Sequence, residues 1–376
     1  MTSITDAGTV TSAPHRMSFY RRHKDVVDGY LFLAPFLAVY IVFLVYPFLK
    51  GVWISLHNWN LMAVAFNPDA KEFVGIKNYV RFLWGRDMTW DLTAAWMPRL
   101  IVLLTGCAAA YMAMKGQITR RMAFVIGIGV TVVWVLLGFH PGEGGRWYDR
   151  RFWPAVSNTF VFVILTVPGV TAIGLALAIA LNRETRMMTV YRTVFFLSHV
   201  LSVSVVTLIW AFLFNSQRGL LAEVTERLGA EPIVWLTNPD LAMVSIVIAT
   251  VWWSMGIAMV LFLAGLQGIP SERYEAARLD GAGGWALFRH ITLPGLTRTT
   301  TLVVVLQTIA HFQVFGQSHL MTQGGPNDAT QTVVRHIYQA GFRDSELGEA
   351  AAMSMFLFVI MMIFALLQLR ISRVED

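Results

Sequence analysis

Stretches of about 20 predominantly apolar residues recur along this sequence, and they restrict its fold more than any other feature. Each stretch is long enough to cross the hydrocarbon core of a bilayer as an α-helix. We expect about eight such spans, at residues 29–49, 94–114, 122–139, 154–181, 193–214, 241–266, 299–320 and 350–369. The sequence therefore predicts an all-α polytopic membrane protein.

The overall composition supports this fold class and excludes several others. Hydrophobic residues make up 56% of the 376 residues and charged residues only 14%, whereas soluble proteins average about 25% charged residues. A soluble domain of this length could not bury so much apolar surface, and a disordered chain would be far more polar. The single cysteine excludes a scaffold of internal disulfides.

The distribution of basic residues predicts the orientation of the chain in the membrane. Residues 1–28 are polar and basic, so we expect a cytoplasmic tail and a retained first span instead of a cleaved signal peptide. With segments 115–121, 182–192, 267–298 and 370–376 also inside, the cytoplasmic side holds 16 of the 29 basic residues and nine of the 23 acidic residues. The positive-inside rule then predicts that both termini are cytoplasmic.

The loop at 269–294, between the sixth and seventh predicted spans, is expected to form two short helices on the cytoplasmic side. Ser271 is predicted to be the N-cap of the first helix, and Gly281 is predicted to end it. The second helix is expected to stop before Pro294. Such a pair of helices suits docking into a groove on a partner protein. An ordinary amphipathic connector is the alternative interpretation.

The residues of this loop resemble the signature of ATP-binding cassette (ABC) importer permeases. That signature is Glu-Ala-Ala, three residues, Gly, nine residues and Ile-x-Leu-Pro, and it is matched by Glu275, Ala276, Ala277, Gly281, Ile291, Leu293 and Pro294. The resemblance implies that this coupling loop, together with Asp280, receives the motion of a cytoplasmic ATPase. Segments 73–79, 152–159, 208–215 and 320–330 are similar to the carbohydrate-uptake branch, the maltose, trehalose and glycerol-phosphate type permeases.

The resemblance also implies a multi-subunit assembly in the inner membrane. The expected partners are a second permease subunit, which would form a heterodimer with this chain, two copies of a cytoplasmic ABC ATPase and an extracytoplasmic solute-binding protein. The chain contains no P-loop and no metal-ligand spacing. We therefore expect a transport subunit without enzymatic activity or cofactor, and with no role in nucleic-acid binding, whose partner subunits hydrolyse the ATP.

The expected domain organisation has four parts: a cytoplasmic tail at 1–28, the first span and an outer loop at 29–85, an inserted helical hairpin at 86–151, and a permease core at 152–376 that includes the coupling loop at 269–294. Members of the family usually have only a few residues in place of 86–151. An added hairpin that enters the membrane from outside and returns leaves the orientation of the core unchanged.

Polar and aromatic residues at membrane depth form the candidate substrate path, because such side chains usually face a cavity or a neighbouring helix. Amides can bind sugar hydroxyls, and aromatic rings can stack on the sugar ring. Two groups qualify: Trp252, Gly256 and Met259, which share one helical face, and the run His311, Phe312, Gln313, Phe315 and Gln317. Helix packing is the alternative role for each of these residues, and the partner permease could supply most of the solute contacts.

The predicted function is that of a permease subunit of an ABC importer, which takes up a sugar or related polyol and couples ATP hydrolysis by a partner to alternating access. The alternative is a secondary transporter driven by an ion gradient, which predicts inverted repeats and a charged residue at the membrane midplane. A membrane-embedded enzyme would need paired carboxylates or metal ligands at one depth. The sequence has none of these patterns, and the scarcity of charge near the path favours a neutral sugar.

Overall fold

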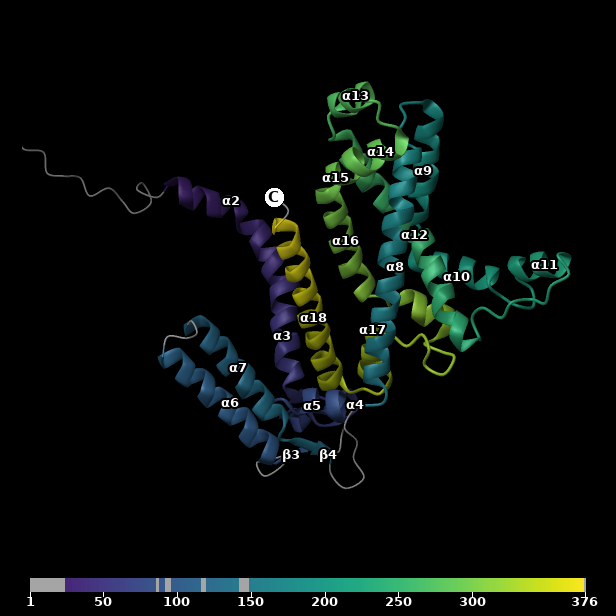
Figure 1. The fold of residues 1–376 in the computed structure, drawn as a ribbon. Coiled ribbons are helices and arrows are strands. Elements are labelled where there is room, and N and C mark those ends of the chain that lie inside the picture. Colours follow the sequence, from purple (N-terminus) through teal and green to yellow (C-terminus); the bar gives the residue numbers. More distant parts are fainter. Residues whose placement is uncertain (1–23, 86–87, 92–95, 116–119, 142–148, 375–376) are drawn as a thin grey trace, which may run out of the picture. The chain divides into compact units, whose positions relative to one another are not determined.

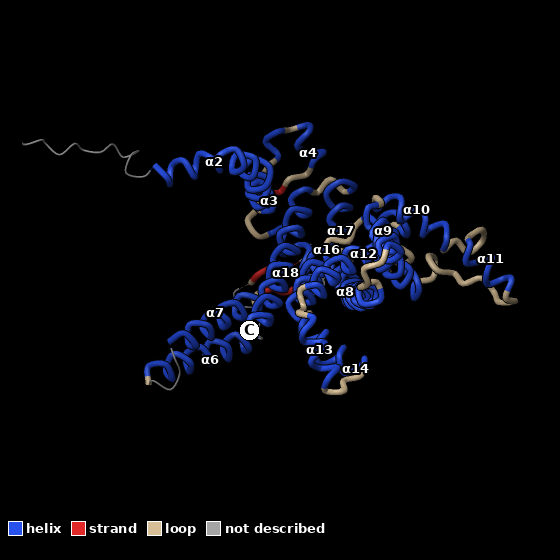
Figure 2. The backbone as a smooth tube through the Cα atoms, turned by 90° about the horizontal axis from the view of Figure 1, so that it is seen from above, coloured by secondary structure: helices blue, strands red, loops and turns tan. Residues whose placement is uncertain are grey.

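A computed structural model describes residues 24–85, 88–91, 96–115, 120–141 and 149–374. This part of the chain is mostly helical (Figure 1), and its strands are confined to two short antiparallel pairs (Figure 2). Five of its helices are long and apolar enough to cross a membrane, and a bent pair of helices counts as a possible sixth. These five are Asp28–Ser55, Trp96–Met114, Phe152–Ala180, Pro239–Gln267 and Leu347–Gln368. The predicted all-α polytopic membrane fold is confirmed.

The first apolar helix belongs to a unit that is separate from residues 54–376. Its successive parts are α2 (Lys24–Tyr40), the π-helical turn η1 (Ile41–Val45) and α3 (Tyr46–Ser55). Large apolar side chains along it, such as Phe32 and Phe43, are exposed. A helix that is apolar on all sides is typical of a membrane span, because lipid can cover every face.

The second unit begins with a small cap of short elements. They are β1 (His57–Asn58), α4 (Leu61–Phe66), η2 (Pro68–Ala70), β2 (Glu72–Phe73) and α5 (Lys77–Trp84). The Nδ2 atom of Asn78 donates hydrogen bonds to the carbonyl oxygens of Ser55 at 2.8 Å and His57 at 2.9 Å. These buried bonds hold α5 against β1 and the residue at the end of α3.

A two-helix hairpin follows this cap. Its elements are β3 (Met88–Trp90), α6 (Trp96–Met114), α7 (Arg120–Leu136) and β4 (Phe139–Pro141). Arg99 interrupts the apolar pattern of α6, yet it is only 3% exposed. Its guanidinium lies 5.1 Å from the ring centroid of Trp90 and 4.4 Å from that of Trp134, and Nη1 donates to the carbonyl oxygen of Asp91 at 2.9 Å. These contacts offset the cost of a buried positive charge.

The remaining long helices form one bundle. They are α8 (Phe152–Ala180), α9 (Arg186–Val200), α10 (Val203–Leu213), α12 (Pro239–Gln267), α16 (Thr297–Phe312) and α18 (Leu347–Val374), with the short α11 (Leu220–Arg227) after α10. Helix α18 contacts α16 and α17 (Val333–Tyr338). The helices α8, α9, α10 and α16 all contact α12. A Cβ atom at Gly174 of α8 would lie 2.6 Å from the Cβ of Ala258 in α12. The close approach of these two helices therefore depends on glycine.

Two of the predicted spans are broken helices. In place of one span at 193–214, α9 and α10 meet at a bend of 98°. In place of one span at 299–320, α16 ends at Phe312 and helical structure resumes as η4 (Ser318–Thr322). The first break is held by the indole Nε1 of Trp253, which donates to the carbonyl oxygen of Leu201 at 3.0 Å. Because that contact is tertiary, hydropathy along the chain could not reveal the break.

The chain between η4 and α18 is fixed to the start of α8. It contains α17 (Val333–Tyr338) and the π-helical turn η5 (Gln339–Arg343). The Nδ2 atom of Asn158 donates to the carbonyl oxygens of Asp328 at 2.8 Å and Gln331 at 3.1 Å. The Oγ1 atom of Thr159 accepts a hydrogen bond from the backbone nitrogen of Val333 at 3.0 Å. Of these three bonds, the one between Thr159 and Val333 is buried, so it satisfies two polar groups that water does not reach.

Candidate functional site

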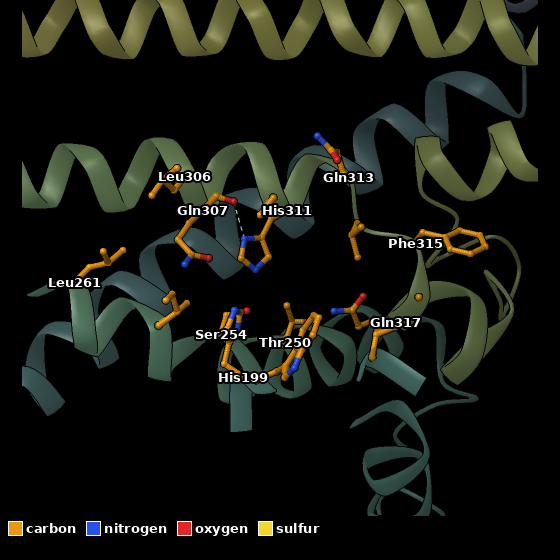
Figure 3. Close-up of a pocket in the computed structure, with 16 residues that line it drawn as sticks. His199, Thr250, Ser254, Leu261, Leu306, Gln307, His311, Gln313, Phe315 and Gln317 are labelled. Atoms are coloured by element: carbon orange, nitrogen blue, oxygen red, sulfur yellow. Dashed lines mark hydrogen bonds between the residues drawn. The ribbon is translucent and has the colours of Figure 1, made fainter. Parts of the chain in front are cut away.

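A cavity of about 520 Å³ lies between α12 and α16, next to both helix breaks (Figure 3). The lining residues come from four places in the chain: the end of α9, the start of α10, the middle of α12, and α16 with the residues that follow it. They are His199, Val203, Thr250, Trp253, Ser254, Ile257, Leu261, Leu306, Gln307, Ala310, His311, Gln313, Val314, Phe315, Gly316 and Gln317. Irregular backbone at membrane depth is tolerated where it lines such a cavity.

Three buried polar side chains give the cavity its hydrogen-bonding capacity. Gln307 is 6% exposed, His311 is 4% exposed and Gln317 is 5% exposed. The side chains of His311 and Gln317 point into the cavity from different elements (Figure 3). The Nδ1 atom of His311 bonds to the carbonyl oxygen of Gln307 at 2.7 Å. Because a carbonyl only accepts, the neutral imidazole carries its proton on Nδ1, and Nε2 is left as an acceptor toward the cavity.

The facing wall, on α9 and α12, adds hydroxyl and aromatic groups. Ser254 and Thr250 point toward the cavity from α12 (Figure 3). The Oγ1 atom of Thr250 donates to the carbonyl oxygen of Ile246 at 2.8 Å and keeps its lone pairs as acceptors. The rings of His199 and Trp253 pack together with their centroids 5.8 Å apart. The described lining residues include no Asp, Glu, Lys or Arg, so the cavity suits an uncharged polar solute.

Four of the eight residues predicted for the substrate path line this cavity: His311, Gln313, Phe315 and Gln317. Their side chains are not equivalent. Gln313 is exposed, and its Nε2 atom bonds to the Sδ atom of Met361 on α18 at 3.6 Å. The ring of Phe315 points away from the centre of the cavity (Figure 3). Of the four, His311 and Gln317 are therefore the residues placed to contact a solute.

The other four predicted residues do not line this cavity. Met259 and Phe312 are almost fully buried in the apolar core. Gly256 lies at the contact of α12 with α9, where a Cβ would be 3.0 Å from the Cα of Phe196. The ring of Trp252 packs against Trp210 at 5.8 Å. The three α12 residues do share a helical face, but that face meets neighbouring helices.

Sequence reasoning missed several residues of the cavity as contacts for a solute: His199, Thr250, Ser254 and Gln307. A signal was available for Gln307, because it lies four residues before His311 and therefore on the same face of a helix. No comparable signal exists for His199 or Ser254. They join the cavity only through the bend between α9 and α10 and the packing of α9 on α12.

The predicted coupling loop forms a second candidate site, at the end of the bundle where α12 stops and α16 starts (Figure 1). Its elements are α13 (Ser271–Leu279), α14 (Gly284–Leu287), the π-helical turn η3 (Phe288–Thr292) and α15 (Leu293–Gly295). The first helix is preceded by Pro270 without a side-chain cap, so the prediction of Ser271 as N-cap is wrong. The second helical stretch also continues through Pro294 instead of stopping before it.

The turn between these helices depends on Gly281, whose φ of +80° favours glycine. Its backbone nitrogen donates to the carbonyl oxygen of Arg278 at 3.0 Å, and that of Ala282 donates to Ala277 at 2.9 Å. This is the usual way in which glycine ends a helix. The hydroxyl of Tyr274 lies 3.0 Å from the Oγ1 atom of Thr292, which joins the two helical stretches.

Large apolar side chains are exposed on this coupling segment. Leu279 is 90% exposed and Trp285 is 71% exposed. The residues predicted for the coupling loop differ in exposure. Ala277 and Ile291 are partly covered. The exposed ones are Glu275, Ala276, Asp280, Gly281, Leu293 and Pro294. Exposed apolar residues on a charged segment are typical of a docking surface. The described residues contain no cluster of metal-ligating side chains.

A comparison with protein families identifies the chain. Residues 156–373 match the family described as "Binding-protein-dependent transport system inner membrane component". The chain belongs to this family. The matched region is more than half of the sequence, and it contains both the cavity and the coupling segment. The protein is therefore a multi-pass permease subunit of the inner membrane.

Individual relatives agree with the family. The permease is 28% identical over 355 residues to the trehalose/maltose transport system permease protein MalF of Thermococcus litoralis. The aligned region covers 94% of this chain and 96% of the relative. It is 37% identical over 225 residues to the sn-glycerol-3-phosphate transport system permease protein UgpA of Rhizobium meliloti. This aligned region covers 59% of this chain and 76% of the relative. The predicted resemblance to the carbohydrate-uptake branch is confirmed.

The fold of the permease is also found in a solved structure. A chain in the crystal structure of a bacterial alginate ABC transporter, in complex with an alginate pentasaccharide-bound periplasmic protein, matches with a TM-score of 0.66 at 17% identity. The match covers 95% of this chain and 98% of the other. The predicted function of an ABC importer permease is confirmed by the family and the relatives, and the alternative of a secondary transporter has no support.

Proposed function

We propose that this permease subunit imports a neutral sugar or related polyol along a path that includes the cavity between α12 and α16. One observation carries the proposal: Gln307, His311 and Gln317 are buried at a cavity with no charged residue in its described lining. Amide and imidazole groups both donate and accept hydrogen bonds, as sugar hydroxyls do. A phosphate or carboxylate solute would instead favour a cationic lining. The trehalose and maltose named for one relative belong to the neutral class.

The partners proposed for the permease are a second permease subunit, two copies of a cytoplasmic ABC ATPase and an extracytoplasmic solute-binding protein. The exposed side chains of Leu279 and Trp285 support docking of the coupling segment into an apolar groove of the ATPase. ATP binding and hydrolysis by that partner would move the coupling segments and so favour one orientation of the cavity over the other. In this proposal the permease transmits motion and gates the path, and the partner performs the only chemical step.

The proposed orientation has both termini and the coupling segment in the cytoplasm. It places residues 86–151 in a hairpin inserted from the opposite side, with residues 140–150 outside the cell membrane. Position 145 lies outside the described residues. A Gly145→Cys variant, made with Cys107→Ser so that one thiol remains, should react with an impermeant maleimide in intact spheroplasts. Reaction only after lysis would contradict the inserted hairpin.

Purification and reconstitution test the proposed function. A tagged copy of the chain should co-purify with a second permease and an ATPase. Proteoliposomes that contain this complex and its binding protein should take up a radiolabelled neutral disaccharide, with trehalose and maltose as the first probes, only when ATP is enclosed. Unlabelled neutral sugars should compete, and sn-glycerol 3-phosphate should compete weakly. Uptake that follows an ion gradient without ATP, or competition by anionic solutes alone, would contradict the proposal.

A further inference from the structure

Four aromatic rings form a continuous row that begins at the cavity wall. Phe315 and His319 lie one helical turn apart and stack with their centroids 4.9 Å apart. Both rings lie 5.1 Å from the ring of Tyr338 on α17. Tyr338 in turn stacks on Phe342 of η5 at 5.3 Å. We call Phe315, His319, Tyr338 and Phe342 the aromatic row.

The two ends of the aromatic row have different surroundings. Phe315 is one of the residues that line the cavity, and its ring points away from the centre of the cavity (Figure 3). That ring contacts Tyr338 of the row. Phe342, at the other end, is 70% exposed. It belongs to the connection between η4 and α18, which lies at the end of the helices opposite to the coupling segment (Figure 1). The row therefore links the cavity to the face that the proposed orientation places outside the membrane.

Cationic donors accompany the aromatic row. Arg335 on α17 and Arg343 next to Phe342 both interact electrostatically with His319, and Arg335 also donates a hydrogen bond to Gln331. Arg343 is exposed. Each guanidinium presents five N–H donors and no acceptor. Rings beside such donors match a pyranose, which has a flat C–H face for stacking and hydroxyls around its edge.

We propose that the aromatic row is an entry subsite on which a pyranose sugar stacks after it leaves the binding protein and before it reaches the cavity. This inference rests on the proposed function, because it takes the solute to be a sugar. Phe342 is the outermost ring and makes the first contact. The inner rings and Arg343 hold the sugar close to the cavity mouth, which raises its local concentration there.

Alanine replacement of Phe342 tests the subsite. Because the ring is mostly exposed, Phe342→Ala should leave the thermal stability and membrane content of the complex unchanged. The initial rate of disaccharide uptake at a limiting concentration of loaded binding protein should fall about 2- to 12-fold, the range typical of one aromatic contact. Phe342→Tyr should keep the wild-type rate. Phe66→Ala is the matched control, because Phe66 on α4 is 89% exposed and does not belong to the row.

Each outcome decides the inference. An uptake rate for Phe342→Ala equal to that of Phe66→Ala overturns the entry subsite and leaves the proposed function intact. A Phe342→Ala complex that no longer retains the binding protein during purification also overturns it, because the residue would then dock the protein and not the sugar. A wild-type complex that takes up no neutral sugar overturns both the subsite and the proposed function. A slower rate with full retention of the binding protein supports the subsite.

Discussion

Replacing Gly256 by alanine separates the two roles that the sequence leaves open for this residue, solute contact and helix packing. In the structure a Cβ at Gly256 would lie 3.0 Å from the carbonyl carbon of Phe195 and from the Cα of Phe196, and closer still to the oxygen of Phe195. These are backbone atoms of α9, which cannot rotate away as a side chain can. The variant can be accommodated only if α9 and α12 move apart.

The size of the effect follows from these distances. Carbon atoms attract each other best at about 3.5–4.0 Å, so the helices must separate by roughly 0.5 Å or more. Overpacking of this kind costs about 1–3 kcal/mol. A change of that size corresponds to a roughly 5- to 150-fold shift in an equilibrium constant. We therefore expect Gly256→Ala to lower the melting temperature and the amount of folded permease.

Fluorescence-detected size-exclusion chromatography after heating measures the folded fraction, and uptake normalised to membrane-inserted protein measures function. The molecules that remain folded should keep the wild-type half-saturation concentration, because Gly256 does not line the cavity. Gly127→Ala on α7 is the control, since a Cβ there meets no atom within 4 Å. Wild-type stability combined with a raised half-saturation concentration would refute the packing role and return Gly256 to the solute path.

Three further predictions concern the cavity, the coupling turn and pH. Gln317→Ala should raise the half-saturation concentration for uptake about 2- to 12-fold through loss of one hydrogen bond, whereas Gln313→Ala, whose side chain contacts Met361, should not. Gly281→Val should abolish uptake without loss of membrane-inserted protein because of its positive φ, and Gly283→Val, at φ −73°, should transport normally. Burial lowers the pKa of His336 below the ordinary 6.5, so the folded state favours the neutral imidazole. The contribution of His336 to stability is therefore present above pH 6.5 and is lost below it. The melting temperature should fall between pH 8 and pH 5, and it should fall less for His336→Gln than for the wild-type permease.

The fold class and the coupling segment could be predicted from the sequence because their signals are local. A run of apolar residues identifies a membrane helix wherever its neighbours lie, since lipid can cover all of its faces. The turn at Gly281 is similarly local, because only the residues beside it decide whether its backbone can take a positive φ. The family signature across 275–294 keeps a fixed spacing, so it can be recognised without any structure.

The cavity depended on tertiary structure. Spacing alone shows that Trp252, Gly256 and Met259 share a helical face, but it does not show which way that face points. The next residue along the chain is turned by about 100°, and so Trp253 lines the cavity while Trp252 packs against Trp210. Predicting that rotation would require the positions of α9 and α16 in advance.

The two broken helices show the same difference: their apolar character follows from the sequence, and the position of each bend follows from tertiary contacts. Hydropathy indicated that 193–214 and 299–320 are apolar enough for a membrane, and both segments are largely helical. Where they bend is decided by contacts between residues far apart in the chain, such as the bond from Trp253 to the carbonyl oxygen of Leu201. A helix in lipid breaks only where other groups satisfy its freed backbone atoms. The sequence thus indicated which segments are apolar enough for a membrane, and tertiary packing decided where two of them bend.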